Sequence, residues 1–100
     1  MEIKIIWSDE SIKTFDDNID YLKVFWSPKE VSKFLKQVDY VISRIQEFPE
    51  SFNPSLKNKR IRRARINSYI TLYYRYNKLQ NKIILLSFWN VKQDPSKIQC

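Results

Sequence analysis

The spacing of apolar residues changes about halfway along the chain. Up to about residue 48 they recur every three or four positions, and from about residue 59 they tend to alternate every two. A period near 3.6 predicts amphipathic helices, whereas a period of two predicts strands. The pattern therefore predicts two helices followed by a group of strands, with one further short strand at the start.

Residues 2–7 predict that first strand, because Ile3, Ile5 and Trp7 share one face at a period of two. Ser8 is placed to act as the N-cap of a helix, and the two acids after it suit a first helical turn. This helix carries one apolar stripe, formed by Ile12, Phe15, Ile19 and Leu22.

A second helix is predicted from the segment Ser27-Pro28-Lys29-Glu30. Ser27 suits the cap, Pro28 the first helical position, and Glu30 completes a capping box. Apolar residues then keep a helical period until Pro49, at Val31, Phe34, Leu35, Val38, Val41, Ile42, Ile45 and Phe48. Two helices with a short break between them predict an αα-hairpin.

After a loop over residues 49–56, the second half predicts three strands. Residues 59–66 alternate poorly, which indicates an edge strand or a bulge. Residues 69–76 alternate well, with Ile70, Leu72, Tyr74 and Tyr76 on one face and Tyr69, Thr71, Tyr73 and Arg75 on the other. Residues 77–82 suit a hairpin connection, and residues 83–89, apolar on both faces, suit a central strand.

The predicted order is therefore β-α-α-β-β-β. A lone first strand needs a partner, so we expect it to join the later hairpin in one mainly antiparallel sheet. The helical hairpin then covers one face of that sheet, which defines an α+β fold. The length of 100 residues suits a single domain spanning residues 1–100, with a tail over about residues 96–100.

Composition excludes several kinds of chemistry. The chain has no glycine, which excludes glycine-rich phosphate loops, and no histidine, the commonest general base and metal ligand. The one cysteine is Cys100, so no internal disulfide forms, and we expect neither metal nor cofactor. Four acids of the first helix, Asp9, Asp16, Asp17 and Asp20, are better interpreted as a solvated face than as a magnesium site. No leader and no long apolar run are present, which favours a cytoplasmic protein.

Charge divides the chain into two unlike halves. Residues 1–50 hold ten acids and seven bases and sum to −3, whereas residues 51–100 hold one acid and eleven bases and sum to +10. Between Glu50 and Asp94 there is no acid, and the bases are Lys57, Lys59, Arg60, Arg62, Arg63, Arg65, Arg75, Lys78, Lys82 and Lys92. A field of one sign repels itself and attracts a polyanion. This run therefore predicts a surface for nucleic acid or for an acidic protein segment.

The candidate binding residues combine this run with nearby aromatics. They are Lys57, Lys59, Arg60, Arg62, Arg63, Arg65, Tyr69, Tyr73, Arg75 and Lys92. Tyr69 and Tyr73 are on the polar face of their strand, where a ring is able to stack on a base, although tyrosines in strands more often serve packing. Arg75 has two interpretations, contact with a phosphate or stacking on Tyr73 or Trp89.

Taken together, these segments resemble the RelE/ParE superfamily of bacterial toxins over almost the whole chain. The resemblance is carried by the strand Ile5-Ile6-Trp7-Ser8, the helix end Phe48-Pro49-Glu50, the basic strand around Arg62, and the run from Ser68 to Tyr74. It continues through the apolar strand from Ile83 and a basic residue before Asp94-Pro95. It implies the toxin of a type II toxin–antitoxin module, of the plasmid-stabilisation kind, neutralised by a cognate antitoxin in a hetero-oligomer.

The superfamily implies two mechanisms. ParE-like members inhibit DNA gyrase, whereas RelE-like members cut messenger RNA on the ribosome. The nucleases often place an arginine after the first tyrosine of the strand, where this chain has Ile70, and many use a C-terminal histidine or tyrosine that is absent here. These departures favour the gyrase inhibitor. If the chain is a nuclease, its candidate catalytic residues are Arg62, Arg65, Arg75 and Lys92. The alternative is a non-toxic basic module that binds nucleic acid.

Overall fold

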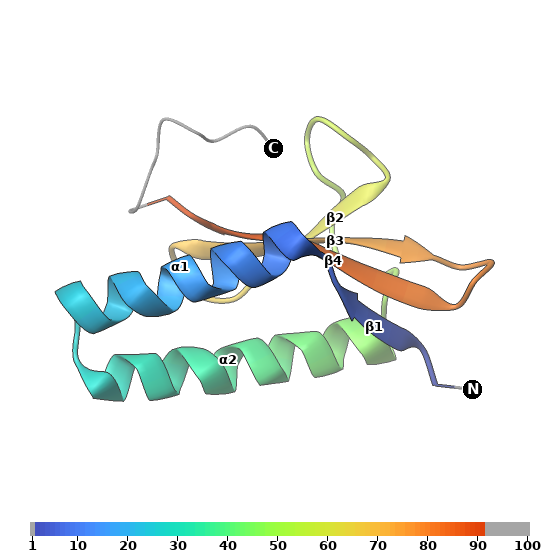
Figure 1. The fold of residues 1–100 in the computed structure, drawn as a ribbon. Helices are drawn as coiled ribbons and strands as arrows, with labels where there is room; N and C mark the ends of the chain where they lie inside the picture. Colours follow the sequence, from blue (N-terminus) through green and yellow to red (C-terminus); the bar gives the residue numbers. More distant parts are fainter. Residues whose placement is uncertain (1, 92–100) are drawn as a thin grey trace.

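The computed structural model describes residues 2–91, and Lys92, Asp94 and the expected C-terminal tail lie outside them. The elements are β1 (Lys4–Trp7), α1 (Asp9–Phe25), α2 (Pro28–Glu47), β2 (Ile61–Arg65), β3 (Ile70–Asn77) and β4 (Lys82–Asn90). This order confirms the predicted β-α-α-β-β-β arrangement and the α+β class. In Figure 1 the two helices run antiparallel to each other on the same side of the sheet.

The four strands form one sheet in the order β1-β4-β3-β2. β1 pairs with β4 in parallel, and the other two pairings are antiparallel, so the sheet is mixed. β4 is central, as its apolar residues predicted, and β2 lies at an edge. The outer edge of β2 is covered by the loop before it, since the backbone N–H of Ser55 donates to the Ile61 carbonyl and that of Arg63 to the Asn53 carbonyl. This cover protects the edge from pairing with another strand.

Of the two alternatives for residues 59–66, an edge strand or a bulge, the structure shows the edge strand, and a bulge lies in β4. Tyr73 is opposite Ser87, but Tyr74 is opposite Leu85, so Leu86 is the extra residue. It reverses the alternation, so that Ile83 and Leu85 before it and Phe88 and Asn90 after it are all buried. Ser8 holds the bulge in place, because its hydroxyl donates to the Leu86 carbonyl at 3.2 Å.

The core lies between α2 and the sheet. Phe34, Val38, Val41 and Ile45 are buried along one face of α2, at the period that the sequence showed. They belong to one cluster with the buried residues of the sheet, Ala64, Ile70, Leu72, Tyr74, Ile83, Leu85 and Phe88. This packing leaves the opposite face of the sheet without a helix (Figure 1).

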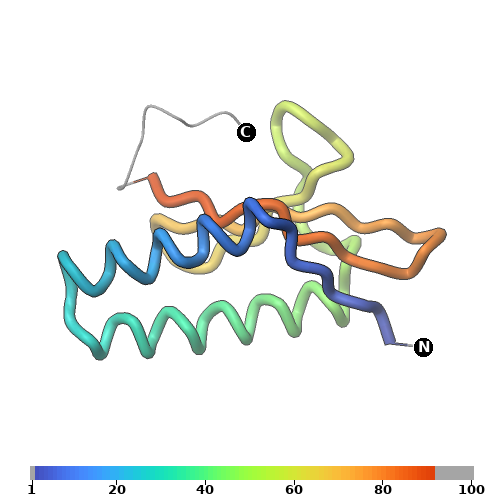
Figure 2. The backbone as a smooth tube through the Cα atoms, in the orientation of Figure 1, coloured from blue at the N-terminus to red at the C-terminus, as the bar shows by residue number. Residues whose placement is uncertain are grey.

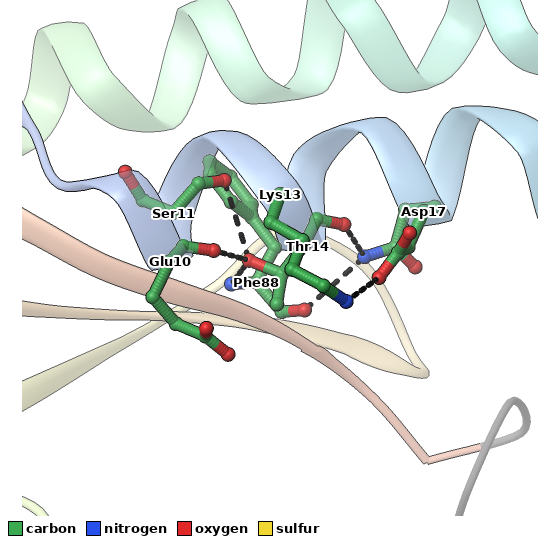
Figure 3. Close-up of polar contacts among 7 residues, drawn as sticks. Glu10, Ser11, Lys13, Thr14, Asp17 and Phe88 are labelled. Atoms are coloured by element: carbon green, nitrogen blue, oxygen red, sulfur yellow. Dashed lines mark hydrogen bonds and ion pairs between the residues drawn. The ribbon is translucent and has the colours of Figure 1, made fainter.

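α1 contacts the sheet through polar residues as well as through Phe15 of the predicted apolar stripe. Its buried residues are Ser11, Asn18 and Leu22, whereas Ile12 is about half exposed. β1 pairs with β4 only as far as Leu85, so beyond that point α1 takes the place of a neighbouring strand. The Phe88 N–H donates to Thr14 Oγ1 at 2.9 Å (Figure 3), and Asn18 Nδ2 donates to the Phe88 carbonyl at 3.1 Å. Buried backbone groups need such partners.

The helix starts are those that the sequence predicted, but only one has the predicted side-chain cap. Ser8 caps α1, since its hydroxyl oxygen accepts from the Ser11 N–H at 3.0 Å. Ser27 is the N-cap residue of α2 and Pro28 follows it, yet the Ser27 side chain makes no capping hydrogen bond. The predicted capping box with Glu30 is therefore wrong, and the Glu30 N–H donates to the Ser27 carbonyl instead.

Candidate functional site

The uncovered face of the sheet carries part of the predicted binding set. Strand pairing places Arg63 beside Tyr73, and Arg65 beside Thr71. Side chains directly opposite in neighbouring strands share a face, and the next residues along, Ala64 and Leu72, are buried against the helices. Arg63, Arg65, Tyr73 and Arg75 therefore lie on the uncovered face. The alternation of residues 69–76 predicted this for Tyr73 and Arg75, whereas residues 59–66 predicted no face for Arg63 and Arg65.

Arg62 lies on the other face and has a structural role. Its Nη1 donates to the carbonyl oxygens of Glu50 at 3.2 Å and Phe52 at 2.8 Å. Arg63 supports the same loop, because its Nε donates to the Pro54 carbonyl at 3.1 Å. Hydrogen bonds from charged donors are stronger than neutral ones, so these two arginines fix the loop before β2.

The candidate catalytic arginines do not meet at one point. Arg65 is opposite Thr71, and Arg75 is opposite Ile61, at the other end of β2. Four residues of strand separate these positions, about 13 Å along the sheet. Arg62 is on the opposite face, and Lys92 lies outside the described residues. A catalytic group must be within hydrogen-bond reach of the reacting atoms, so the three described arginines do not act on a single phosphate in this arrangement.

Ile70 stands where RelE-like nucleases often have an arginine, and its surroundings in the structure are apolar too. Ile70 is fully buried in the core, so a side chain at this position does not reach the uncovered face. The next residue, Thr71, does lie on that face, beside Arg65. Neither position offers a cation to a phosphate.

Tyr69 is already stacked within the molecule. Its ring lies parallel to that of Trp26, with centroids 6.1 Å apart and an angle of 9° between the planes. Burial, followed by the nearby Glu30 carboxylate, raises the pKa of Tyr69 above its usual value. Packing is therefore the role that the structure gives Tyr69, whereas Tyr73 is half-buried beside Arg63 on the uncovered face.

Trp89 also lies on the uncovered face, opposite Thr71. Its indole Nε1 is buried and has no hydrogen-bond partner among residues 2–91. An unpaired buried donor lowers the free energy of unfolding by about 1–3 kcal/mol, so the position of this indole destabilises the fold. Trp89 therefore lies against the sheet on the same face as Thr71.

Four of the predicted binding residues line a single hollow of about 530 Å³ at one end of the sheet. They are Lys59, Arg60, Arg62 and Arg75, and Lys78 and Tyr76 join them. Lys57, Arg63, Arg65, Tyr69 and Tyr73 do not line it. Lys78 belongs to the basic run of the sequence but was not among the candidate binding residues, and Tyr76 was predicted only to share a face with Ile70, Leu72 and Tyr74. Tyr76 does pack against the core cluster, but it is only partly buried.

Other kinds of site are not found in the described part of the chain. Residues 2–91 contain no group of three or more His, Cys, Asp or Glu residues placed to hold a metal ion. Asp17, which the sequence assigned to a solvated face, pairs with Lys13 at 3.1 Å on the surface of α1 (Figure 3). Within the same residues, neither helix is long and apolar enough to cross a membrane.

Comparison with protein families agrees with this architecture. Residues 5–95 match the model of the family described as ParE toxin of type II toxin–antitoxin system, parDE. The match spans most of the chain, so the protein belongs to the ParE toxin family. No match was found among curated protein sequences.

Solved structures with the same fold include several toxins. The chromosomal ParDE system from P. aeruginosa aligns with a TM-score of 0.73 at 12% identity, over 89% of this chain and 96% of that one. The YoeB/ParE toxin from Agrobacterium tumefaciens gives 0.63 at 12% identity, covering 88% and 98%. The toxin–antitoxin complex RelBE2 from Mycobacterium tuberculosis gives 0.62 at 11% identity, covering 90% and 99%. At such identities the likeness concerns the fold.

Proposed function

We propose that this type II toxin arrests growth by inhibiting DNA gyrase through surface contact, without chemistry of its own. The observation that carries the proposal is the separation of the candidate catalytic arginines. Arg62 and Arg75 line the same hollow, but Arg62 is bonded to loop carbonyls, and Arg65 lies at the opposite end of β2 from Arg75. Buried Ile70 supports it, because RelE-like nucleases often hold an arginine there.

The contact surface in this proposal is the uncovered face of the sheet, with Arg65, Tyr73 and Trp89. A basic surface with aromatic side chains suits a partner that presents acidic groups, because opposite potentials speed association and fix its orientation. Arg65 is exposed on this face and makes no ion pair with residues 2–91, so its charge is directed to solvent or to a partner.

The test is a DNA supercoiling assay with purified gyrase and the purified toxin. We expect wild-type toxin to inhibit supercoiling and Arg65→Glu to raise the half-inhibiting concentration by about tenfold or more, as truncating interface charges does. Lys36→Glu is the matched control, because it makes the same charge change on exposed α2 and should alter the value by less than about threefold.

Expression in a bacterial host separates the alternatives. The proposal predicts an early stop in DNA synthesis with intact messenger RNA. An early stop in protein synthesis with cut messenger RNA would show a RelE-like nuclease instead. Growth that continues unchanged, together with salt-sensitive nucleic-acid binding, would show the non-toxic binding module.

A cognate antitoxin completes the proposal. The similar structures from P. aeruginosa and M. tuberculosis are described as a ParDE system and a toxin–antitoxin complex. On this chain the helical hairpin exposes apolar side chains, among them Ile12, Leu35 and Tyr40. An apolar helix that folds on binding is suited to cover them. Coexpression of the antitoxin should restore growth, and Leu35→Asp in the toxin should weaken that rescue.

A further inference from the structure

The basic hollow exists because β3 and β4 extend further than β2. β2 begins at Ile61, opposite Arg75, so the next residues of β3, Tyr76 and Asn77, have no partner in β2. The loop before β2 bounds the hollow on one side, and the turn after β3 bounds it on the other. In Figure 2 this loop and this turn stand apart at the same end of the molecule.

Five cations and one acid line this hollow. Lys78 pairs with the acid, Glu50, at 3.6 Å, and Arg62 donates to loop carbonyls. The side chains of Lys59, Arg60 and Arg75 make no hydrogen bond and no ion pair with other residues in the range 2–91. Three cationic residues therefore line one space without an acid paired to them, which favours an anionic ligand.

The size and lining of the hollow specify the anion further. A volume of about 530 Å³ is far larger than one phosphate group needs and is in the range of sites for organic ligands. Tyr76 is partly buried in the wall, and its ring makes no contact with another aromatic ring among residues 2–91. A tyrosine ring beside unpaired arginines is the usual platform for a base next to its phosphate.

We propose that this hollow binds one nucleotide unit of a single-stranded nucleic acid. Arg60 and Arg75 hold the phosphate. Tyr76 stacks on the base from the other face of β3, because the hollow lies where β3 has no partner in β2 and both faces of its edge are open there. Arg75 also lies on the uncovered face of the sheet, and Arg63 and Arg65 lie further along the same face. These two arginines are placed to bind the neighbouring phosphates of the strand. An acidic peptide would match the charges but would leave Tyr76 without a planar partner.

The test measures binding of a fluorescein-labelled oligothymidylate of about ten nucleotides by fluorescence anisotropy. Arg60→Gln with Arg75→Gln should weaken binding by about tenfold or more at low salt and reduce the salt slope by about two, one for each phosphate contact. Lys33→Gln with Lys36→Gln removes the same charge from exposed positions of α2 and should change affinity by less than about threefold.

Two further measurements identify the ligand. Ultraviolet crosslinking of a bromodeoxyuridine oligonucleotide should modify the peptide that contains Tyr76. Oligoglutamate of equal charge should compete only at much higher concentration.

Equal weakening by both double variants would reduce the effect to net charge and overturn the proposal. Competition by oligoglutamate at the same concentration as the oligonucleotide would make the hollow a carboxylate site and also overturn it. These experiments use the purified chain alone, so they fail or succeed independently of gyrase inhibition.

Discussion

Tyr74 connects the core to the loop that carries the basic residues. The side chain is fully buried, and its hydroxyl donates to the Pro49 carbonyl at 2.8 Å. Burial raises the pKa of Tyr74 well above its usual value, and the nearby Arg62 charge lowers it only in part. A tyrosine with a raised pKa in the folded state stabilises the fold fully at pH below its unfolded value, about 10, and this contribution is lost as pH rises through the folded value.

Tyr74→Phe should therefore have two effects. At pH 7 it removes one buried hydrogen bond and leaves the Pro49 carbonyl unpaired, which should lower the free energy of unfolding by about 1–2 kcal/mol. Above about pH 10 the fall of stability with pH should be shallower than in the wild type, because one of the tyrosines that resist ionisation is gone. Urea unfolding at a series of pH values measures both.

Tyr40→Phe is the control for this prediction, because Tyr40 is 66% exposed on α2. It should leave the pH dependence unchanged. Equal slopes for wild type and Tyr74→Phe at alkaline pH would contradict the role given to the buried phenol.

Among the elements, α1 is held to β4 by a polar contact. Asn18 Nδ2 donates to the Thr14 and Phe88 carbonyls, and Asn18 Oδ1 accepts from Asn90 Nδ2 at 2.9 Å. Asn18→Ala should lower the free energy of unfolding by roughly 2 kcal/mol, because the Phe88 carbonyl and the Asn90 amide each lose a partner in a buried place. Urea unfolding at neutral pH measures the loss.

Asp17→Ala, one position away on the same helix, is the matched control. Its partner is exposed Lys13, and surface pairs of this kind contribute little, so the change should stay within about 0.5 kcal/mol. If the two variants were equally stable, the polar contact between α1 and β4 would be incidental to the fold.

The same contact shows what sequence periodicity reveals and what it omits. Periodicity predicted every element, the place of the central strand and the buried face of α2. The face of α2 was predictable because packing against the sheet decides which of its sides is apolar. For α1, periodicity predicted Phe15, Ile19 and Leu22, which do pack in or against the core, but it missed the polar part of the buried face. Thr14 and Asn18 complete a strand edge there, and polar residues at such positions look solvated in the sequence. Periodicity also missed that Tyr76 and Lys78 line the same hollow as Arg60, because that depends on how far β3 runs past β2.

Across the whole molecule, the basic half lacks internal compensation. Of the nine bases between residues 57 and 91, only Lys78 forms an ion pair with a described residue. Like charges held close together destabilise the compact state, and salt screens them over a Debye length of about 10 Å at 0.1 M. The melting temperature of the wild type should therefore rise by several degrees between about 10 mM and 200 mM sodium chloride, and the free energy of unfolding should rise with it.

The basic hollow should account for part of that cost. Arg60→Gln with Arg75→Gln should raise the melting temperature at low salt by about 2–4 °C, because two of the unpaired charges that line the hollow are gone, and the gain should vanish at high salt. Lys33→Gln with Lys36→Gln should give no rise, since those lysines belong to the half of the chain with net negative charge. Differential scanning fluorimetry across a salt series provides the comparison. A lower melting temperature for the arginine variant at every salt concentration would mean that these arginines stabilise the fold. A higher melting temperature at low salt would mean that the arginines destabilise the fold and serve to bind a ligand.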